Sequence, residues 1–208
     1  WRNRPLHDID IKYMYMDGVN FEMRVDHSIE KVPVLVVIGI TYNNQKVFLV
    51  IQQGDKESAS TWREIFKDLK QRGLKKDKIQ LGVMDGLSGL EKVFSDEFSN
   101  AKIQRCQVHV SRNVLSKVPH SKKQEVADKL RDIFYASSRP KAMEFYNQFV
   151  LDYEKLFPSA VNSLKSNIES CLSFFSFPKD EWISLRTTNA IERVNKEFKR
   201  RTKPMAIL

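Results

Sequence analysis

The chain has 208 residues, of which 41% are hydrophobic and 29% charged, values ordinary for a soluble folded protein. Its longest apolar run, 32–40, contains a proline and falls far short of the roughly 20 residues needed to cross a bilayer. No signal peptide is visible at the start. Two cysteines, Cys106 and Cys171, do not make a disulfide framework and fit a reducing compartment. These features argue against a membrane-spanning or disulfide-rich protein.

Positive charge is concentrated near one end of the chain. Lys and Arg number 35 against 26 Asp and Glu, a net charge of +9, and 186–208 alone holds seven basic residues against two acidic ones. A basic terminal helix is typical of a surface that binds a polyanion, although a solvated helix face has the same composition. The chain starts at Trp1 and stops just after this segment, so we expect it to be part of a longer protein.

The first quarter of the chain has the pattern of three strands. Residues 11–24 mix aromatic, methionine and polar residues, with a turn expected near Gly18. The Val- and Ile-rich run 32–42 and the run 46–52 follow, separated by the turn signal Asn43-Asn44. Because the connections are short, we expect the three strands to be antiparallel.

Helical and strand spacing alternate in the next part. The expected elements are a helix over 58–71, a strand over 79–84, a helix over 87–98, and a strand over 101–109 that leads into a helix at 111–117. Strands separated by helices at these distances pair in parallel through crossovers. The pattern therefore predicts an α/β fold with a mixed five-stranded sheet flanked by helices.

The region that follows is helical throughout. Three helices are predicted, over 122–135, 140–157 and 159–172. They separate the strands from the basic segment, which indicates an insertion beside the sheet. We therefore predict three parts: a core over 1–118, an all-helical insertion over 119–175, and a C-terminal basic helix over 176–208 that completes the core.

Two aspartates stand in settings that suit metal-dependent chemistry. Asp17 lies in a predicted strand, where aspartate is disfavoured, and its structural alternative is an Asp-Gly hairpin turn with Gly18. Asp85 lies where the 79–84 strand ends and can serve as a helix N-cap. That edge of a parallel sheet is equally where open sheets build ligand sites.

Glu192, near the start of the basic helix, is the third candidate. The spacing Asn189-x-x-Glu192 is also that of a capping box, so the pattern leaves both a capping and a catalytic role open. Two strand-borne aspartates and one helix-borne glutamate can together hold two hard divalent cations over a phosphodiester. This interpretation predicts an enzyme that acts on DNA.

Cys106 and His109 have the spacing of a metal-ligand pair. A structural zinc site needs four clustered ligands, and no second pair of this kind is present in the sequence. A buried cysteine and a hydrogen-bonded histidine at a strand end are therefore favoured over a zinc site.

Eight short phrases occur along the chain in a fixed order. They are Trp1 with Arg4-Pro5-Leu6, Asp17-Gly18, Val37-Ile38-Gly39-Ile40, Glu57-Ser58-Ala59-x-x-Trp62, Asp68-Leu69-Lys70-x-Arg72-Gly73-Leu74, Asp85-Gly86-x-x-Gly89-Leu90, Gln104-Arg105-Cys106-x-Val108-His109, and Arg186-Thr187-Thr188-Asn189-x-Ile191-Glu192-Arg193-x-Asn195. In this order they closely resemble the catalytic domain of the Mutator-type transposases of bacterial insertion sequences.

The resemblance implies a ribonuclease H-like core with a helical insertion before the last acidic residue. It implies that Asp17, Asp85 and Glu192 form a catalytic triad that binds two Mg²⁺ or Mn²⁺ ions, with Asp17 bridging both. Cys106 and His109 fall on a family signature, which places them beside the site.

The activity that the resemblance implies is cleavage at transposon ends and transfer of the freed strand to target DNA. Partners would be the terminal inverted repeats and the target, with a homo-oligomer when ends are synapsed, in the bacterial cytoplasm near the nucleoid. Expected DNA contacts are Arg186, Asn189, Arg193, Asn195, Lys196, Lys199, Arg200 and Arg201. Two alternatives stay open: a catalytically silent nucleic-acid-binding domain and a stand-alone nuclease of the same fold.

Overall fold

The computed structural model describes residues 2–25, 28–53, 58–86 and 88–202. The chain divides into two compact units. The sheet unit consists of Trp1–Ile103 with Thr188–Leu208, and the helical unit consists of Gln104–Thr187. The helical unit thus extends beyond the predicted 119–175 insertion at both ends.

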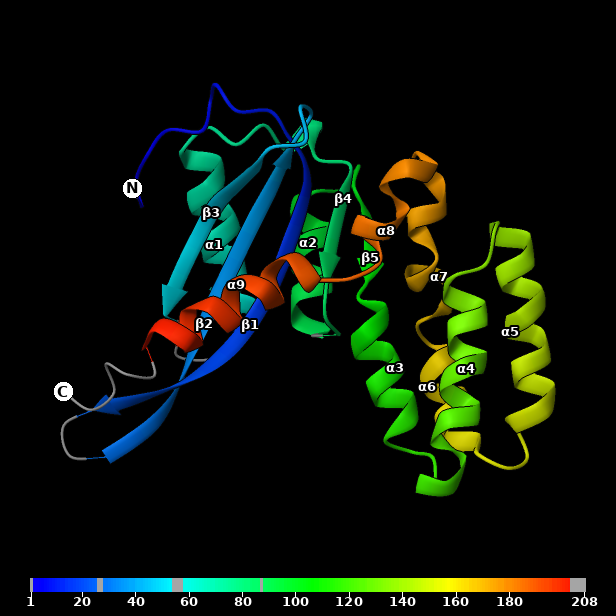
Figure 1. The fold of residues 1–208 in the computed structure, drawn as a ribbon. Coiled ribbons are helices and arrows are strands. Elements are labelled where there is room, and N and C mark those ends of the chain that lie inside the picture. The colour runs from blue at the N-terminus through cyan, green and yellow to red at the C-terminus, as the bar shows by residue number, and fades with distance from the viewer. Residues whose placement is uncertain (1, 26–27, 54–57, 87, 203–208) are drawn as a thin grey trace. The chain divides into compact units, whose positions relative to one another are not determined.

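A five-stranded sheet forms the centre of the sheet unit, with the strand order β3-β2-β1-β4-β5 (Figure 1). The strands are β1 Ile11–Val25, β2 Ser28–Thr41, β3 Lys46–Gln53, β4 Leu81–Met84 and β5 Lys102–Arg105. β2 is antiparallel to both β1 and β3, whereas β4 is parallel to β1. The predicted mixed five-stranded sheet flanked by helices is confirmed.

β1 continues straight through Asp17-Gly18. Asp17 pairs with Val36 and Gly18 with Leu35, in a ladder that runs on to Val25 and Ser28. The expected turn near Gly18 is therefore wrong. The apolar residues of β2 provide a partner along the whole of β1, so ladder hydrogen bonds and burial outweigh the turn preference of one dipeptide.

Alternation along β1 directs its side chains to two different faces of the sheet. Met14 and Met16 belong to the main core, which they form with α1 Ala59–Gln71 and α2 Ser88–Glu97. Tyr13, Tyr15 and Asp17 alternate with these methionines and are buried as well. They therefore belong to the opposite face of the sheet.

The opposite face is covered by the last helix, α9 Asn189–Thr202, which packs against β1. Figure 1 shows α9 crossing the sheet on one side while α1 and α2 lie on the other. The sheet unit is thus a three-layer arrangement of helices, sheet and helix. The described part of α9 thus lies against the central strand, β1.

The helical unit confirms the predicted run of helices. Its elements are α3 Gln107–Leu115, α4 Lys123–Phe134, α5 Arg139–Tyr153, α6 Pro158–Lys165, α7 Ile168–Cys171 and α8 Trp182–Leu185. The predicted 159–172 helix is interrupted at 166–167, giving α6 and α7. The predicted 101–109 strand ends at Arg105, because α3 begins at Gln107. In the described part of the chain, no helix has the length and apolar character needed to cross a bilayer.

Candidate active site

Two of the three predicted acids lie side by side at one edge of the parallel strand pair. β1 and β4 pair as far as Met16 and Met84, and Asp17 and Asp85 are the residues that follow. Neighbouring strands are about 4.8 Å apart, so residues at equivalent positions are close neighbours. Beyond this point β4 has ended while β1 continues beside β2, which opens the sheet next to Asp17.

Asp17 is directed toward the face that α9 covers. Asp17 is 4% exposed and alternates with the core residue Met16. Asp85 likewise follows Met84, another residue of the main core. Asp17 therefore lies on the side of the sheet away from α1 and α2, and Asp85, which follows the end of β4, is partly buried. Burial of a carboxylate is costly unless a cation or hydrogen-bond donors compensate for it.

α9 carries the third acid. Thr188 is the N-cap of this helix, because its carbonyl accepts from the amides of Ile191 at 2.8 Å and Glu192 at 3.1 Å. Glu192 is thus the fourth residue of the helix, one position later than a capping box requires. The capping-box alternative built on Asn189 is therefore not supported by the register. Sequence reasoning missed this cap because asparagine, here Asn189, is preferred over threonine, here Thr188, as an N-cap residue.

The face of α9 toward the sheet is marked by two buried residues. Ile191 is fully buried, and Asn195, one turn later, is 5% exposed. Residues four apart lie on the same side of a helix. Asn195 is therefore on the sheet side of α9 and not exposed to solvent, and its contact with DNA stays a prediction.

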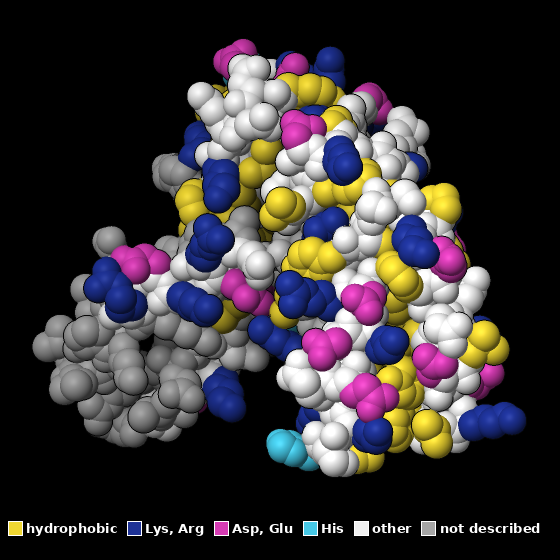
Figure 2. All heavy atoms as spheres, turned by 45° about the vertical axis from the view of Figure 1, so that its right-hand side comes forward, with side chains coloured by type: hydrophobic (Ala, Val, Ile, Leu, Met, Phe, Trp, Pro, Cys, Tyr) yellow, Lys and Arg dark blue, Asp and Glu magenta, His cyan; other side chains and the backbone are white. Residues whose placement is uncertain are grey.

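The predicted DNA contacts on α9 are largely on its outer side. Asn189, Arg193, Lys196 and Arg200 are exposed. Arg200 is engaged by Glu197 on the same helix through bonds of 2.9 and 2.7 Å. The side chains of Lys199 and Arg201 lie outside the described residues. Figure 2 shows Lys and Arg side chains spread among Asp and Glu over the face in view, not gathered in one patch. The candidate DNA-binding surface is therefore the set of exposed basic residues on α9, because the face in view has no single basic patch.

Arg186, the first residue of the last motif, has a different setting from the one expected. It is 7% exposed and stacks on the rings of Tyr135 and Phe174, at 4.6 and 4.8 Å from their centroids. Its carbonyl accepts from the amide of Gln107 at 3.0 Å. Burial lowers the pKa of its guanidinium from the usual value. These contacts give Arg186 a packing role inside the helical unit, and its contact with DNA stays a prediction.

Cys106 and His109 belong to the helical unit. Cys106 is the N-cap of α3 and is 1% exposed, while His109 lies in the first turn of that helix. Cys106 is thus buried directly after the end of β5, as expected, whereas His109 lies in the helix and not at the strand end. A role of this pair beside the acids stays a prediction.

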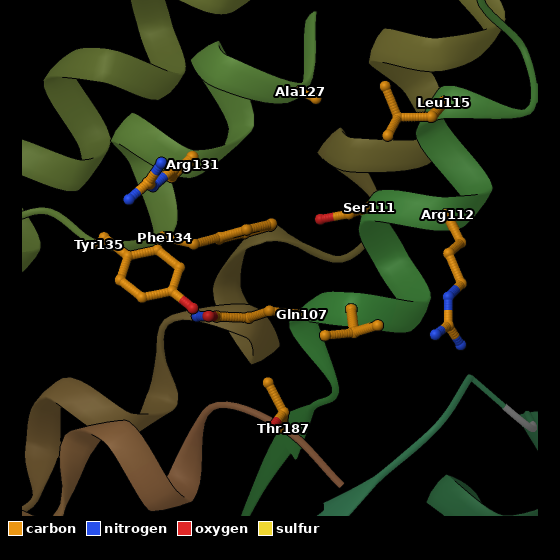
Figure 3. Close-up of a pocket in the computed structure, with 10 residues that line it drawn as sticks. Gln107, Ser111, Arg112, Leu115, Ala127, Arg131, Phe134, Tyr135 and Thr187 are labelled. Atoms are coloured by element: carbon orange, nitrogen blue, oxygen red, sulfur yellow. The ribbon is translucent and has the colours of Figure 1, made fainter. Parts of the chain in front are cut away.

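A pocket of about 220 Å³ opens within the helical unit, between α3 and α4 (Figure 3). Gln107 extends from α3 toward the ring of Tyr135, and the Ser111 hydroxyl points into the space between the helices. The Gln107 amide donates to the Cys171 carbonyl at 2.9 Å. That carbonyl also accepts from Gln104 at 2.8 Å. All the residues that line this pocket belong to the helical unit, and none of the three predicted acids is among them.

The acids fit a divalent cation in chemistry, although they do not form a ready three-ligand cluster. Carboxylate oxygens are the ligands that Mg²⁺ and Mn²⁺ prefer, and Asp17 and Asp85 supply two from adjacent strands. Within the described ranges, no group of three or more His, Cys, Asp or Glu lies close enough to hold a metal ion. Glu192 therefore shares a face with the aspartates without completing a site by itself.

Comparison with known proteins identifies the family. The model of the Mutator family of transposases matches residues 1–208. The chain is 32% identical over 200 residues to the transposase of insertion sequence element IS6120 from Mycolicibacterium smegmatis, covering 96% of the chain and 61% of that protein. It is 30% identical over 190 residues to the IS905 transposase from Lactococcus lactis, covering 91% and 48%. The chain thus spans about half to three fifths of these relatives.

Among solved structures, the chain overlaps the HTLV-2 integrase catalytic core domain in complex with magnesium. The TM-score is 0.33 and the identity 10%, over 76% of this chain and 86% of that one. A likeness this distant carries no inference about the site. The match of the family model over the full length, together with relatives at about 30% identity, shows that this chain belongs to the Mutator family of transposases.

Proposed function

We propose that this chain is the catalytic core of a DNA transposase, with Asp17, Asp85 and Glu192 as its catalytic residues. Membership of the Mutator family supports the transposase role. The observation that supports the assignment is the parallel register of β1 and β4, whose last pair, Met16 and Met84, directly precedes Asp17 and Asp85. α9 adds Glu192 on the same face of the sheet.

The three carboxylates are the residues that hold Mg²⁺ or Mn²⁺ in this proposal. Two such ions, when bound, supply Lewis-acid stabilisation of the phosphoryl oxygens and activate the attacking oxygen. Asp17 is the more buried of the two aspartates and would hold the metal together with Asp85. Glu192 is partly buried on the first turns of α9, from which its side chain can move toward the aspartates. Glu192 would complete the set of metal-holding carboxylates.

The proposed reaction consists of two successive displacements at phosphorus. In cleavage, a water oxygen bonds to phosphorus and the bond to the 3′-oxygen breaks, which leaves a 3′-hydroxyl and a 5′-phosphate. In joining, that 3′-hydroxyl oxygen bonds to a phosphorus of the target, and the target's own 3′-oxygen leaves and takes up a proton. One phosphorus–oxygen bond forms for each that breaks, so neither step needs a separate energy source.

The outer side of α9 is the proposed contact with the DNA backbone. Arg193 and Lys196 are exposed on the same helix that carries Glu192. Contacts from such side chains to phosphates position a duplex without reading its sequence. DNA held along α9 would therefore lie next to the acids. We propose that transposon ends and target DNA are the substrates and that two or more copies of the protein synapse the ends.

The test uses the full-length transposase, its terminal inverted repeat DNA and a target plasmid in Mg²⁺. Asp17→Asn, Asp85→Asn and Glu192→Gln should each lower cleavage and joining by about 10³-fold or more, because metal-dependent stabilisation is worth several kcal/mol. Asp77→Asn is the matched control, since Asp77 is an exposed acid of the same unit. Normal cleavage in any of the three variants would overturn the assignment. Cleavage without joining by the wild-type protein would favour the stand-alone nuclease.

A further inference from the structure

Asn195 is buried in an unusual way. Its side chain is 5% exposed, and both amide atoms, Nδ2 and Oδ1, are out of water and have no hydrogen-bond partner in the described part of the chain. Of the buried side chains described, this is the one in which donor and acceptor are both left unsatisfied. Buried polar groups are nearly always hydrogen-bonded, so each exception calls for an explanation.

Packing alone does not explain an asparagine at this position. Burial of an unsatisfied amide opposes folding, and a leucine of similar size would fill the space without that cost. Asparagine is also a weaker helix former than leucine. In addition, the Asn195 amide does not bond back to the carbonyl of Ile191, as a polar side chain inside a helix can. Asn195 is therefore expected to lower the free energy of unfolding of the protein without bound metal.

The position of Asn195 points to the acidic site. It lies three residues after Glu192 and four after the fully buried Ile191, so it is on the side of α9 that faces the sheet. α9 packs on β1, whose buried carboxylate on this face is Asp17. An amide can donate to a carboxylate oxygen and accept from a metal-bound water at the same time.

We infer that Asn195 is a fourth polar residue of this site and positions its carboxylates and bound cation. The inference rests on the proposed function, because it requires that Asp17 and its neighbours bind a divalent metal ion. The unsatisfied amide is then a preorganised group whose hydrogen bonds are completed when the metal and its waters are in place. Outer-shell partners of this kind typically change metal affinity by about 10–100-fold when removed.

Binding of Mn²⁺ to the full-length protein, measured by isothermal titration, tests the inference. The relevant sites are those that the wild-type protein has and an Asp17→Asn variant lacks. Asn195→Leu should weaken binding at these sites about tenfold or more, and its melting temperature in EDTA should equal or exceed that of the wild type. Ile191→Val is the control, because it perturbs the same buried side of α9 without removing a polar group. It should lower the melting temperature and leave Mn²⁺ affinity unchanged.

Two outcomes would overturn the inference, and they have different meanings. If Asn195→Leu keeps Mn²⁺ affinity within twofold of the wild type, Asn195 does not belong to the metal site, although the proposed function stands. If wild type and Asp17→Asn bind Mn²⁺ equally, the aspartate pair is not a metal site, and the proposed function fails together with this inference.

Discussion

Asp17 and Asp85 directly follow Met16 and Met84, the last pair that joins β1 to β4. The parallel register therefore brings together two acids that are far apart in the sequence. Both acids follow the same end of this parallel strand pair. This arrangement has an energetic consequence that can be measured in the absence of DNA.

Removing one charge of the pair should stabilise the metal-free protein. Like charges on adjacent strands repel, so Asp85→Asn should raise the free energy of unfolding in EDTA by about 0.5–1 kcal/mol. Mg²⁺ should raise the melting temperature of the wild-type protein but not that of the variant. Asp77→Asn, which removes an exposed acid, should behave like the wild type in both conditions. A wild-type melting temperature that does not respond to Mg²⁺ or Mn²⁺ would contradict the metal site.

The exposed basic residues of α9 should dominate non-specific DNA binding by the sheet unit. Arg193→Ala and Lys196→Ala together should weaken binding and reduce the slope of log K against log salt by about two, because each side chain neutralises about one phosphate. Fluorescence anisotropy with a random-sequence duplex at several salt concentrations measures the affinity and this slope. Lys67→Ala with Lys92→Ala is the control, because these exposed lysines are on α1 and α2, across the sheet from α9. An equal effect in the control pair would show that only net charge matters.

Local periodicity was enough to predict most elements of this fold. The strand predicted over 46–52 and the helix over 58–71 correspond to Lys46–Gln53 and Ala59–Gln71. The turn expected near Gly18 failed because a dipeptide preference is local, whereas the pairing of β1 with β2 is a property of the sheet. The parallel crossover was predicted too, and it is what brings Asp85 beside β1.

The details of the site depended on packing that sequence patterns do not describe. The burial of Asn195 depends on how α9 is rotated about its axis over β1, which one charged helix sequence does not specify. Likewise, Arg186 looked like part of a basic DNA-binding segment. Its guanidinium instead lies between two aromatic rings contributed by distant parts of the helical unit.

The stacking of Arg186 predicts a larger effect on stability than on DNA binding. Arg186→Ala removes the stacking on Tyr135 and Phe174 and leaves a cavity, so it should lower the free energy of unfolding by about 2–3 kcal/mol. Arg186→Met keeps much of the buried stem and should cost less. Chemical denaturation measures the free energy of unfolding of both variants. In folded protein, the salt dependence of DNA binding should stay as in the wild type. A reduced slope in Arg186→Met would show that this arginine binds phosphate.

A final prediction concerns the glycine that lets α2 approach β4. A Cβ at Gly82 would lie 2.5 Å from Cζ of Phe94 and within 2.8 Å of two further ring atoms. The ring has little room to move, because Phe94 is fully buried and packs against Phe66 and Phe98 with centroids 6.0 and 4.9 Å away. Gly82→Ala should therefore lower the free energy of unfolding by about 1–3 kcal/mol.

The same substitution should lower catalytic activity as well. Gly82 pairs with Met14, and displacement of β4 would shift Asp85 relative to Asp17 at the end of the strand. Phe94→Leu removes the ring atoms that the new methyl group meets, so the double variant should be more stable than the sum of the two single effects predicts. A double-mutant cycle by denaturant titration measures this coupling. Additive effects would mean that the strain at Gly82 is relieved elsewhere, and the loss of activity would then need another cause.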